Sequence, residues 1–222
     1  KKTEESKKKE IDILYLENSE SFLKNISFDH PINFLSPLLY INSKINILSA
    51  ISSKIRLYEI FFQGFDTFIS SNMIVLFFSL KNCFVSFYNS LIQNNHYQQN
   101  GLIYLESCIC FIELVCFINN KGAILNLVNS ILSINSSFFR NNFAGNQNVN
   151  DILIENERNI LKTQYNISCF KSIFENSQGL SFSAEFNNEI SINNCYFIGL
   201  SLNISQGISI KNCLNLNIDT SL

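Results

Sequence analysis

The chain has 222 residues, of which 46% are hydrophobic and 15% charged, and its formal net charge at pH 7 is −2. So large an apolar fraction supports a folded core and argues against wholesale disorder. A net charge this close to zero gives no electrostatic footprint for nucleic acid, so we expect no nucleic-acid partner.

The N-terminal part carries the weakest pattern. Residues 1–10, KKTEESKKKE, form the only charge block, which predicts a solvated tail or linker, with a basic docking segment as the alternative. Residues 11–59 contain strand-like runs such as KINILSAI without a clear register. Both prolines, Pro31 and Pro37, fall there, where the end or edge of a sheet tolerates them.

No segment of the chain is typical of a leader or a membrane span. The most apolar runs are shorter than the roughly 20 residues that a transmembrane helix needs, so we expect no transmembrane segment. An apolar stretch of signal-peptide type is also absent behind the basic start, and the first residue is Lys1 rather than Met. We therefore expect the chain to be a processed or internal piece of a longer protein.

From residue 60 onward, short runs alternate apolar and polar residues. Examples are NISCFKSIF, EISINNCYF and QGISIKNC, with Asn, Ser and Gly between them. Alternation with period two is typical of half-buried strands, and helix-favouring residues such as Ala are scarce. The sequence therefore predicts an all-β protein.

Five segments repeat one hydrophobic residue followed by polar or small residues, as in FINN and FRNN. The intervals between them are 25, 22, 35 and 23 residues. A fixed period of this size indicates a solenoid, so we expect the five residues to lie buried in one longitudinal column. They are Ile92, Phe117, Phe139, Phe174 and Phe197.

Glycines suggest a second column in step with the first. Gly101, Gly122 and Gly179 lie 16, 17 and 18 residues before Phe117, Phe139 and Phe197, and in the 35-residue interval Asp151 takes the glycine position. The extra length of that interval predicts a loop insertion over residues 143–165, which leaves the coil.

A period near 22 residues with three short strands per turn predicts a right-handed parallel β-helix over residues 60–222. Phe139 would point inward, while Asn141 and Asn142 turn the corner. Asparagine tolerates left-handed backbone, and its amide can bond to the neighbouring coil.

The stretch FINNKGAILNLVNSILSINSSFFRNN resembles the repeats of the pectin-lyase-like right-handed β-helix proteins. It is closest in style to the F-x-x-N and G-G-A-I repeats of polymorphic outer-membrane and ciliate surface proteins, with NKGAI in place of the two glycines. The resemblance covers about residues 60 to 213. It implies a right-handed helix and an extracellular or cell-surface location reached by the secretory pathway, but no activity, because this fold serves enzymes, adhesins and scaffolds alike.

Catalytic chemistry finds little support in the sequence. Polysaccharide-cleaving β-helices need clustered carboxylates, whereas the few Asp residues here are not paired between neighbouring repeats. His30 and His96 are isolated, and we expect Glu113, inside CFIELVCF, to face outward from its strand. We therefore predict no catalytic residue, no metal site and no cofactor.

Seven cysteines are present, without the paired C-x-x-C elements of a zinc site. Cys195 shares the parity of Phe197, which predicts a small buried core residue. Two states remain open: cysteines that are mostly free and buried, or at least one disulfide between coils.

Four N-x-S/T sequons offer sites for N-glycosylation, at Asn25, Asn135, Asn166 and Asn203. We expect Asn166, at the return of the predicted loop, to be the most accessible, with Asn203 and Asn25 as further candidates. Asn135 is the least favoured, because it shares parity with the inward Phe139.

These features favour a non-catalytic β-helix scaffold or surface/adhesion component, part of a larger protein or assembly. The alternatives are a polysaccharide-active lyase or hydrolase, or a glycan-binding module. The C-terminal run SQGISIKNCLNLNIDTSL still alternates like an internal coil, with Gly207 as a further glycine position. We therefore expect partners to be other subunits, further coils of the same chain, or glycans.

Overall fold

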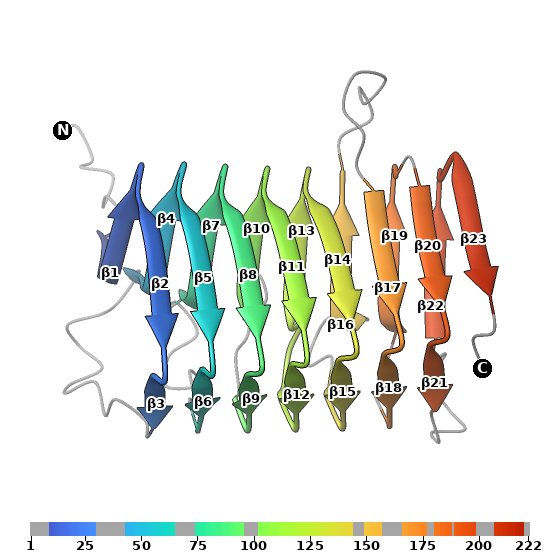
Figure 1. The fold of residues 1–222 in the computed structure, drawn as a ribbon, viewed down its shortest axis with the longest axis horizontal. Coiled ribbons are helices and arrows are strands. Elements are labelled where there is room, and N and C mark those ends of the chain that lie inside the picture. Colours follow the sequence, from blue (N-terminus) through green and yellow to red (C-terminus); the bar gives the residue numbers. More distant parts are fainter. Residues whose placement is uncertain are drawn as a thin grey trace, which may run out of the picture.

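The computed structural model describes residues 9–29, 43–64, 74–95, 102–143, 149–156, 166–176, 180–187, 189–198 and 207–219. Within these ranges every regular element is a β-strand, and neighbouring strands pair in parallel. The strands stack coil upon coil into an elongated solenoid, so the predicted parallel β-helix is confirmed (Figure 1).

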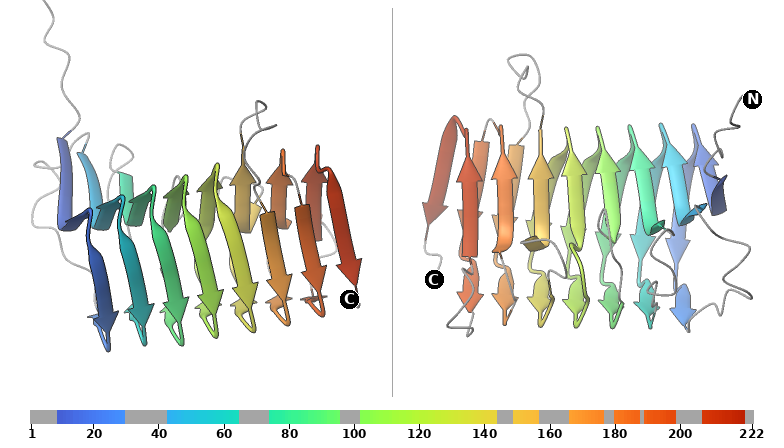
Figure 2. Two further views of the ribbon diagram at one scale, coloured as in Figure 1. Left: turned by 45° about the horizontal axis from the view of Figure 1, so that its top comes forward. Right: turned by 180° about the vertical axis from the view of Figure 1, so that it is seen from behind.

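Three sheets, here called A, B and C, run along the solenoid (Figures 1 and 2). Each of the first seven described coils contributes one strand to each sheet in that order, and the last contributes β22 and β23 to sheets A and B. Sheet A contains β1 (Lys9–Glu17), β4 (Ser43–Ile51), β7 (Ile74–Lys81), β10 (Ile103–Glu106), β13 (Leu125–Val128), β16 (Val149–Glu155), β19 (Leu180–Glu185) and β22 (Gly207–Lys211). Sheet B contains β2 (Glu20–Lys24), β5 (Lys54–Tyr58), β8 (Phe84–Tyr88), β11 (Ile109–Glu113), β14 (Ile131–Asn135), β17 (Asn166–Phe170), β20 (Glu189–Asn193) and β23 (Asn215–Asp219). Sheet C contains β3 (Ser27–Asp29), β6 (Phe61–Gln63), β9 (Leu91–Gln93), β12 (Cys116–Ile118), β15 (Phe138–Arg140), β18 (Ile173–Glu175) and β21 (Tyr196–Ile198).

Alternation along each strand decides which side chains enter the core. In β14, for example, Leu132 and Ile134 are buried while Ile131, Ser133 and Asn135 face outward. Since parallel register repeats this pattern from coil to coil, the inward residues of all three sheets merge into one continuous apolar core.

The five aligned hydrophobic residues lie in one column of sheet C. In-register pairing joins Ile92 to Phe117, Phe117 to Phe139, Phe139 to Phe174 and Phe174 to Phe197. The phenylalanine rings stack in sequence with centroid distances of 4.8, 4.7 and 4.7 Å. The first four residues are buried and Phe197, nearest the C-terminal end, is half-buried.

Corners between the sheets are made by one residue in left-handed conformation followed by one that points inward. Every non-glycine residue with positive φ in the described ranges comes directly after a strand, and eleven of the eighteen are asparagine. Asparagine adopts this conformation at low cost, which explains its abundance here. As predicted, Asn141 is such a corner residue (φ 52°), and its amide Nδ2 donates to Asn119 Oδ1 of the preceding coil at 3.2 Å.

The N-terminal region is more regular than its sequence suggests. Strands β1 to β6 pair in register with the later coils, and Phe28 and Phe62 occupy positions in the column that leads to Ile92. The predicted start of the solenoid at residue 60 is therefore wrong, because β1 already begins at Lys9, inside the predicted charged tail. Residues 1–8 and both prolines lie outside the described residues.

The predicted loop over residues 143–165 is also wrong as a continuous feature. Residues 149–155 form β16, which pairs with β13 on one side and β19 on the other. Pairing of Leu125 with Ile152 places Asp151 level with Ile124, two residues beyond the supposed glycine position at Gly122. Similarly, Gly207 pairs with Leu180 rather than with Gly179, so the glycines do not form a strict column. Gly101 and Gly179 lie outside the described residues.

Candidate functional site

Of the three residues weighed as catalytic, His30, His96 and Glu113, the structure describes Glu113 alone. Glu113 is exposed on sheet B, as expected, and its carboxylate accepts a hydrogen bond from Asn135 Nδ2 at 3.3 Å. His30 and His96 lie outside the described residues. Across the described ranges, no group of three or more His, Cys, Asp and Glu side chains is placed to hold a metal ion. The same ranges hold no helix that is long and apolar enough to cross a membrane.

A buried amide ladder follows sheet C. Asn95 Nδ2 donates to Asn120 Oδ1 at 2.9 Å, Asn120 Nδ2 to Asn142 Oδ1 at 3.2 Å, and Asn142 Nδ2 to the Asp151 carboxylate at 2.9 Å. All four side chains are buried. Two of these amides also donate to backbone carbonyls: Asn120 Nδ2 to Ile92 O, and Asn142 Nδ2 to Phe117 O. These polar groups satisfy one another, which is the arrangement of a structural network.

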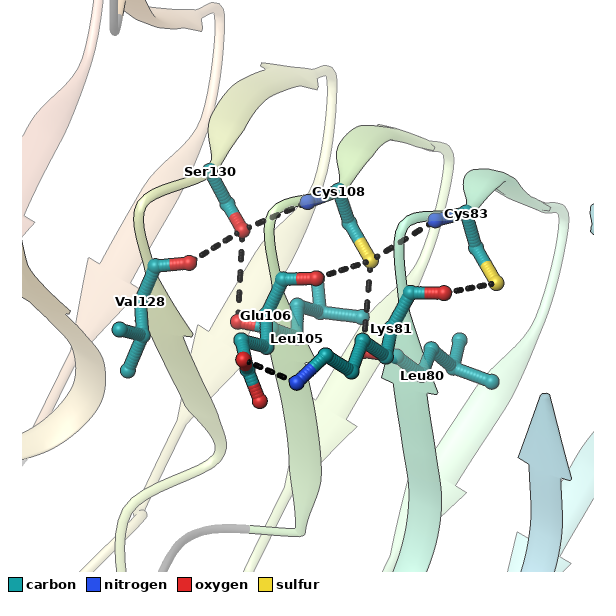
Figure 3. Close-up of polar contacts among 8 residues, drawn as sticks. All are labelled: Leu80, Lys81, Cys83, Leu105, Glu106, Cys108, Val128 and Ser130. Carbon is teal, nitrogen blue, oxygen red and sulfur yellow. Dashed lines mark hydrogen bonds and ion pairs between the residues drawn. The ribbon is translucent and has the colours of Figure 1, made fainter. Parts of the chain in front are cut away.

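A second ladder lies at the corner between sheets A and B, two residues after each sheet A strand. Ser53, Cys83, Cys108 and Ser130 occupy this position in consecutive coils. Figure 3 shows the last three of them. Cys108 Sγ accepts from the Cys83 backbone N–H at 3.4 Å, and Ser130 Oγ accepts from the Cys108 backbone N–H at 3.0 Å. Each side chain also donates to backbone carbonyls: Cys108 to Leu80 and Glu106, and Ser130 to Val128. In this column a thiol and a hydroxyl therefore make the same kinds of hydrogen bond: each accepts from a backbone N–H and donates to backbone carbonyls.

Contact between Cys83 and Cys108 shifts their pKa values in opposite directions. Hydrogen bonding between the two thiols lowers the pKa of Cys83 to about 6 and, together with burial, raises that of Cys108. An ion pair joins the two strands that precede these cysteines, β7 and β10: Lys81 Nζ lies 2.6 Å from Glu106 Oε1 on their outer side (Figure 3).

A third column lies between sheets B and C and contains Ser90, Ser137, Ser172 and Cys195. Serine hydroxyls again accept from the backbone N–H of the preceding coil, as Ser172 Oγ does from Ser137 N at 3.1 Å. At the end of this column, Cys195 Sγ lies 3.5 Å from Cys169 Sγ, and both side chains are buried. Cys195 is buried, as its shared parity with Phe197 predicts.

The most unusual surface is the outward side of sheet B over β2, β5, β8 and β11. We call it the outer aromatic face; it consists of Phe22, Tyr58, Phe84, Tyr88, Ile109 and Phe111. Tyr58 and Tyr88 stack at 4.9 Å with an interplanar angle of 14°, and Phe84 and Phe111 lie 5.3 Å apart. Phe84 is 39% and Phe111 41% exposed. Further along the same side, strands β14, β17 and β20 present Ser133, Ser168 and Ser191 instead.

Ion pairs flank the outer aromatic face at its N-terminal side. Glu20 accepts from Lys54 at 2.9 Å and from Arg56 at 3.3 Å, and these contacts lower the pKa of Glu20, chiefly through the hydrogen bond to Lys54. Lys24 Nζ lies 4.9 Å from the ring centroid of Tyr58 and 4.0 Å from Glu59. The apolar surface therefore has a charged border.

The sequons lie at different depths. Asn25 is a left-handed corner residue after β2, and Asn166 is a partly buried residue at the start of β17. Asn203 lies outside the described residues. The argument against Asn135 is wrong: its side chain faces outward from β14, because the corner at Ser136 resets the alternation before Phe139.

Sequence reasoning missed both the outer aromatic face and the contact of Cys169 with Cys195. The signal for the aromatic face was present in alternate positions of KIRLY, FVSFY and ICFIE, but only the register shows that they share a surface. The two cysteines are 26 residues apart, and no spacing rule joins them.

Comparison with known proteins assigns no family. No family model matches the chain, and no curated protein matches its sequence. Among solved structures, the search finds QnrB1, a plasmid-mediated fluoroquinolone resistance protein. Its match is 9% identical, covers 96% of this chain and 90% of that one, and has a TM-score of 0.23. The parallel β-solenoid thus rests on the strand register of the chain itself.

Proposed function

We propose that this chain is a non-catalytic β-solenoid scaffold that binds a protein partner through the outer aromatic face, as a cell-surface or extracellular part of a larger protein or assembly. The exposed aromatic cluster on sheet B is the observation that carries the proposal. A contiguous apolar patch with a charged border is typical of interaction sites rather than of free surface.

Ring geometry favours a protein over a glycan. A sugar ring stacks on the open face of an aromatic side chain, but Tyr58 is covered by Tyr88 on one side and approached by Lys24. Phe84 and Phe111 also contact each other. The cluster therefore exposes the edges of its aromatic rings rather than their faces. Ring edges and side-chain ends pack well in the apolar centre of a protein interface.

The charged residues of the described coils favour a structural role over polysaccharide cleavage. Glu20, Glu106 and Glu175 each lie in an ion pair with a lysine or arginine of a neighbouring strand. Such carboxylates stabilise the stack and are not arranged as the facing acid and base that glycoside cleavage needs. The resemblance of residues 60–213 to surface-protein repeats agrees with the proposed location.

A matched pair of variants tests the binding surface. We expect Phe84→Ser/Phe111→Ser to lose binding to a partner captured from native extract and then purified, because the apolar centre of the interface is removed. Phe170→Ser, at an equally exposed aromatic residue of β17 outside the cluster, should bind normally. Binding is measured by titration calorimetry, and circular dichroism checks that each variant is folded.

Three outcomes contradict the proposal. Equal binding by both variants excludes the outer aromatic face as the recognition surface. Release of reducing ends or unsaturated sugars from polygalacturonate or another purified polysaccharide, by the unmodified chain, shows an enzyme instead. Specific retention of a soluble oligosaccharide that Phe84→Ser/Phe111→Ser abolishes would indicate a glycan-binding module.

A further inference from the structure

Cys169 and Cys195 bring two thiols from consecutive coils into contact. Cys169 is the last inward residue of β17, and Cys195 is the inward corner residue after β20. Their Sγ atoms are 3.5 Å apart, while Cys195 also lies 3.5 Å from Asn193 O. Both side chains are at most 2% exposed.

We propose that Cys169 and Cys195 form a disulfide that ties the coil of β17 and β18 to the coil of β20 and β21. The inference is independent of the proposed binding surface. A disulfide bond is about 2.05 Å long, so the sulfurs must approach by roughly 1.5 Å. Cys195 follows β20 at the level of Ser172, so the bond would run diagonally across the corner at Lys171, and both coils must shift slightly to close it.

The column of Cys83 and Cys108 differs in that both of its thiols stand in serine positions, whereas in the proposed pair only Cys195 does. Cys83 and Cys108 stand where Ser53 and Ser130 stand in adjacent coils, and their sulfurs bond to backbone groups. They replace serine in a hydrogen-bond ladder. Cys169 has no such equivalent, because the in-register residue of the next coil is Ile192.

The electrostatics of the pair suits thiol–disulfide exchange. Hydrogen bonding between the two thiols lowers the pKa of Cys195 to about 7 and, together with burial, raises the pKa of Cys169. Cys195 is therefore the first nucleophile, since exchange requires a thiolate whose pKa is near the ambient pH.

The reaction needs an oxidant, for which we specify a low-molecular-weight disulfide such as oxidised glutathione. The Cys195 thiolate attacks one glutathione sulfur, the S–S bond breaks, and a glutathione thiolate leaves. Cys169 then loses its proton to solvent and attacks Cys195 Sγ, expelling the second glutathione thiolate. The two cysteines lose two electrons, and oxidised glutathione becomes two reduced molecules. Because both sulfurs are buried, glutathione reaches Cys195 during local opening of the two coils.

The full chain, refolded in a glutathione buffer, tests this assignment. We expect an intact mass lower by two hydrogen atoms and one cross-linked peptide pair, Cys169 with Cys195, after non-reducing proteolysis. The thermal midpoint should rise relative to the reduced protein, because the cross-link limits the unfolded chain. Cys195→Ser should fold, since serine already occupies this column at Ser137 and Ser172, but lose the cross-link and the redox-dependent shift.

Cys116→Ser is the matched control, because Cys116 lies on the outer side of β12 and should leave the cross-link intact. A refolded chain without a disulfide, or one that links Cys83 to Cys108, contradicts the proposal. So does a redox-dependent shift that persists in Cys195→Ser.

Discussion

Phe139 lies between Phe117 and Phe174, with ring centroids 4.8 and 4.7 Å away. Its side chain is fully buried, whereas its neighbour Phe138 faces outward beside Arg140. The two adjacent phenylalanines therefore have opposite environments, decided by the period of the strand.

This contrast predicts different costs for the same truncation. Phe139→Ala should lower the free energy of unfolding by about 3 to 5 kcal/mol, because burial is lost and a cavity remains in the column. Phe138→Ala should cost less than about 1 kcal/mol, since its ring is partly solvated. Urea unfolding followed by circular dichroism measures both; equal losses would show that Phe139 does not support the core.

At the scale of elements, the corners hold the coils together as much as the strands do. Seventeen of the eighteen left-handed non-glycine residues donate their backbone N–H to the next coil, as Asn141 does to Glu175 O at 2.9 Å. At many corners the inward residue that follows closes the ladder with a hydroxyl, thiol or amide, whereas Ile60 and Val115 fill that position with apolar side chains. Repetition of this two-residue corner keeps the three sheets in register.

The serine and cysteine ladder predicts that hydrogen bonding matters more than the sulfur atom. Cys108→Ser should change the free energy of unfolding by less than about 1 kcal/mol, because serine makes the same bonds at Ser130. Cys108→Val has a similar shape but no acceptor, so the buried Cys83 N–H loses its partner at a cost of about 1 to 3 kcal/mol. Chemical denaturation compares the two variants. If valine is tolerated as well as serine, the ladder contributes only packing.

At the scale of the whole molecule, each described strand pairs with strands of the adjacent coils. Strands of a sheet follow one another in strict chain order, so a substitution acts mainly on the adjacent coils (Figure 1). Stability is then close to a sum of coil and interface terms.

Double variants test this one-dimensional behaviour. Leu57, on β5, and Phe139, on β15, lie three coils apart, about 14 Å at a strand spacing of about 4.8 Å. The effects of Leu57→Ala and Phe139→Ala should therefore add within about 0.5 kcal/mol. Phe139→Ala and Phe174→Ala share a contact and should deviate from additivity by more. Strong coupling in the distant pair would indicate cooperative unfolding across the whole solenoid.

The sequence by itself determined the repeating unit and its class. Period-two alternation marked the strands, the aligned Ile92 and phenylalanines marked one column, and Asn141 and Asn142 marked a corner. These features could be predicted because each depends on neighbours within one coil, where local backbone preference and alternation decide the outcome.

Only the tertiary structure decided the register where connections differ in length. Strands β1 to β6 and β16 join the stack through pairing with distant strands, which no local pattern in their sequence specifies. The outer aromatic face and the contact of Cys169 with Cys195 also depend on that register, because their members come from different coils. In a solenoid, residues at the same position of adjacent coils become neighbours. Connections of variable length change the spacing between these positions, so the sequence alone does not show which residues align.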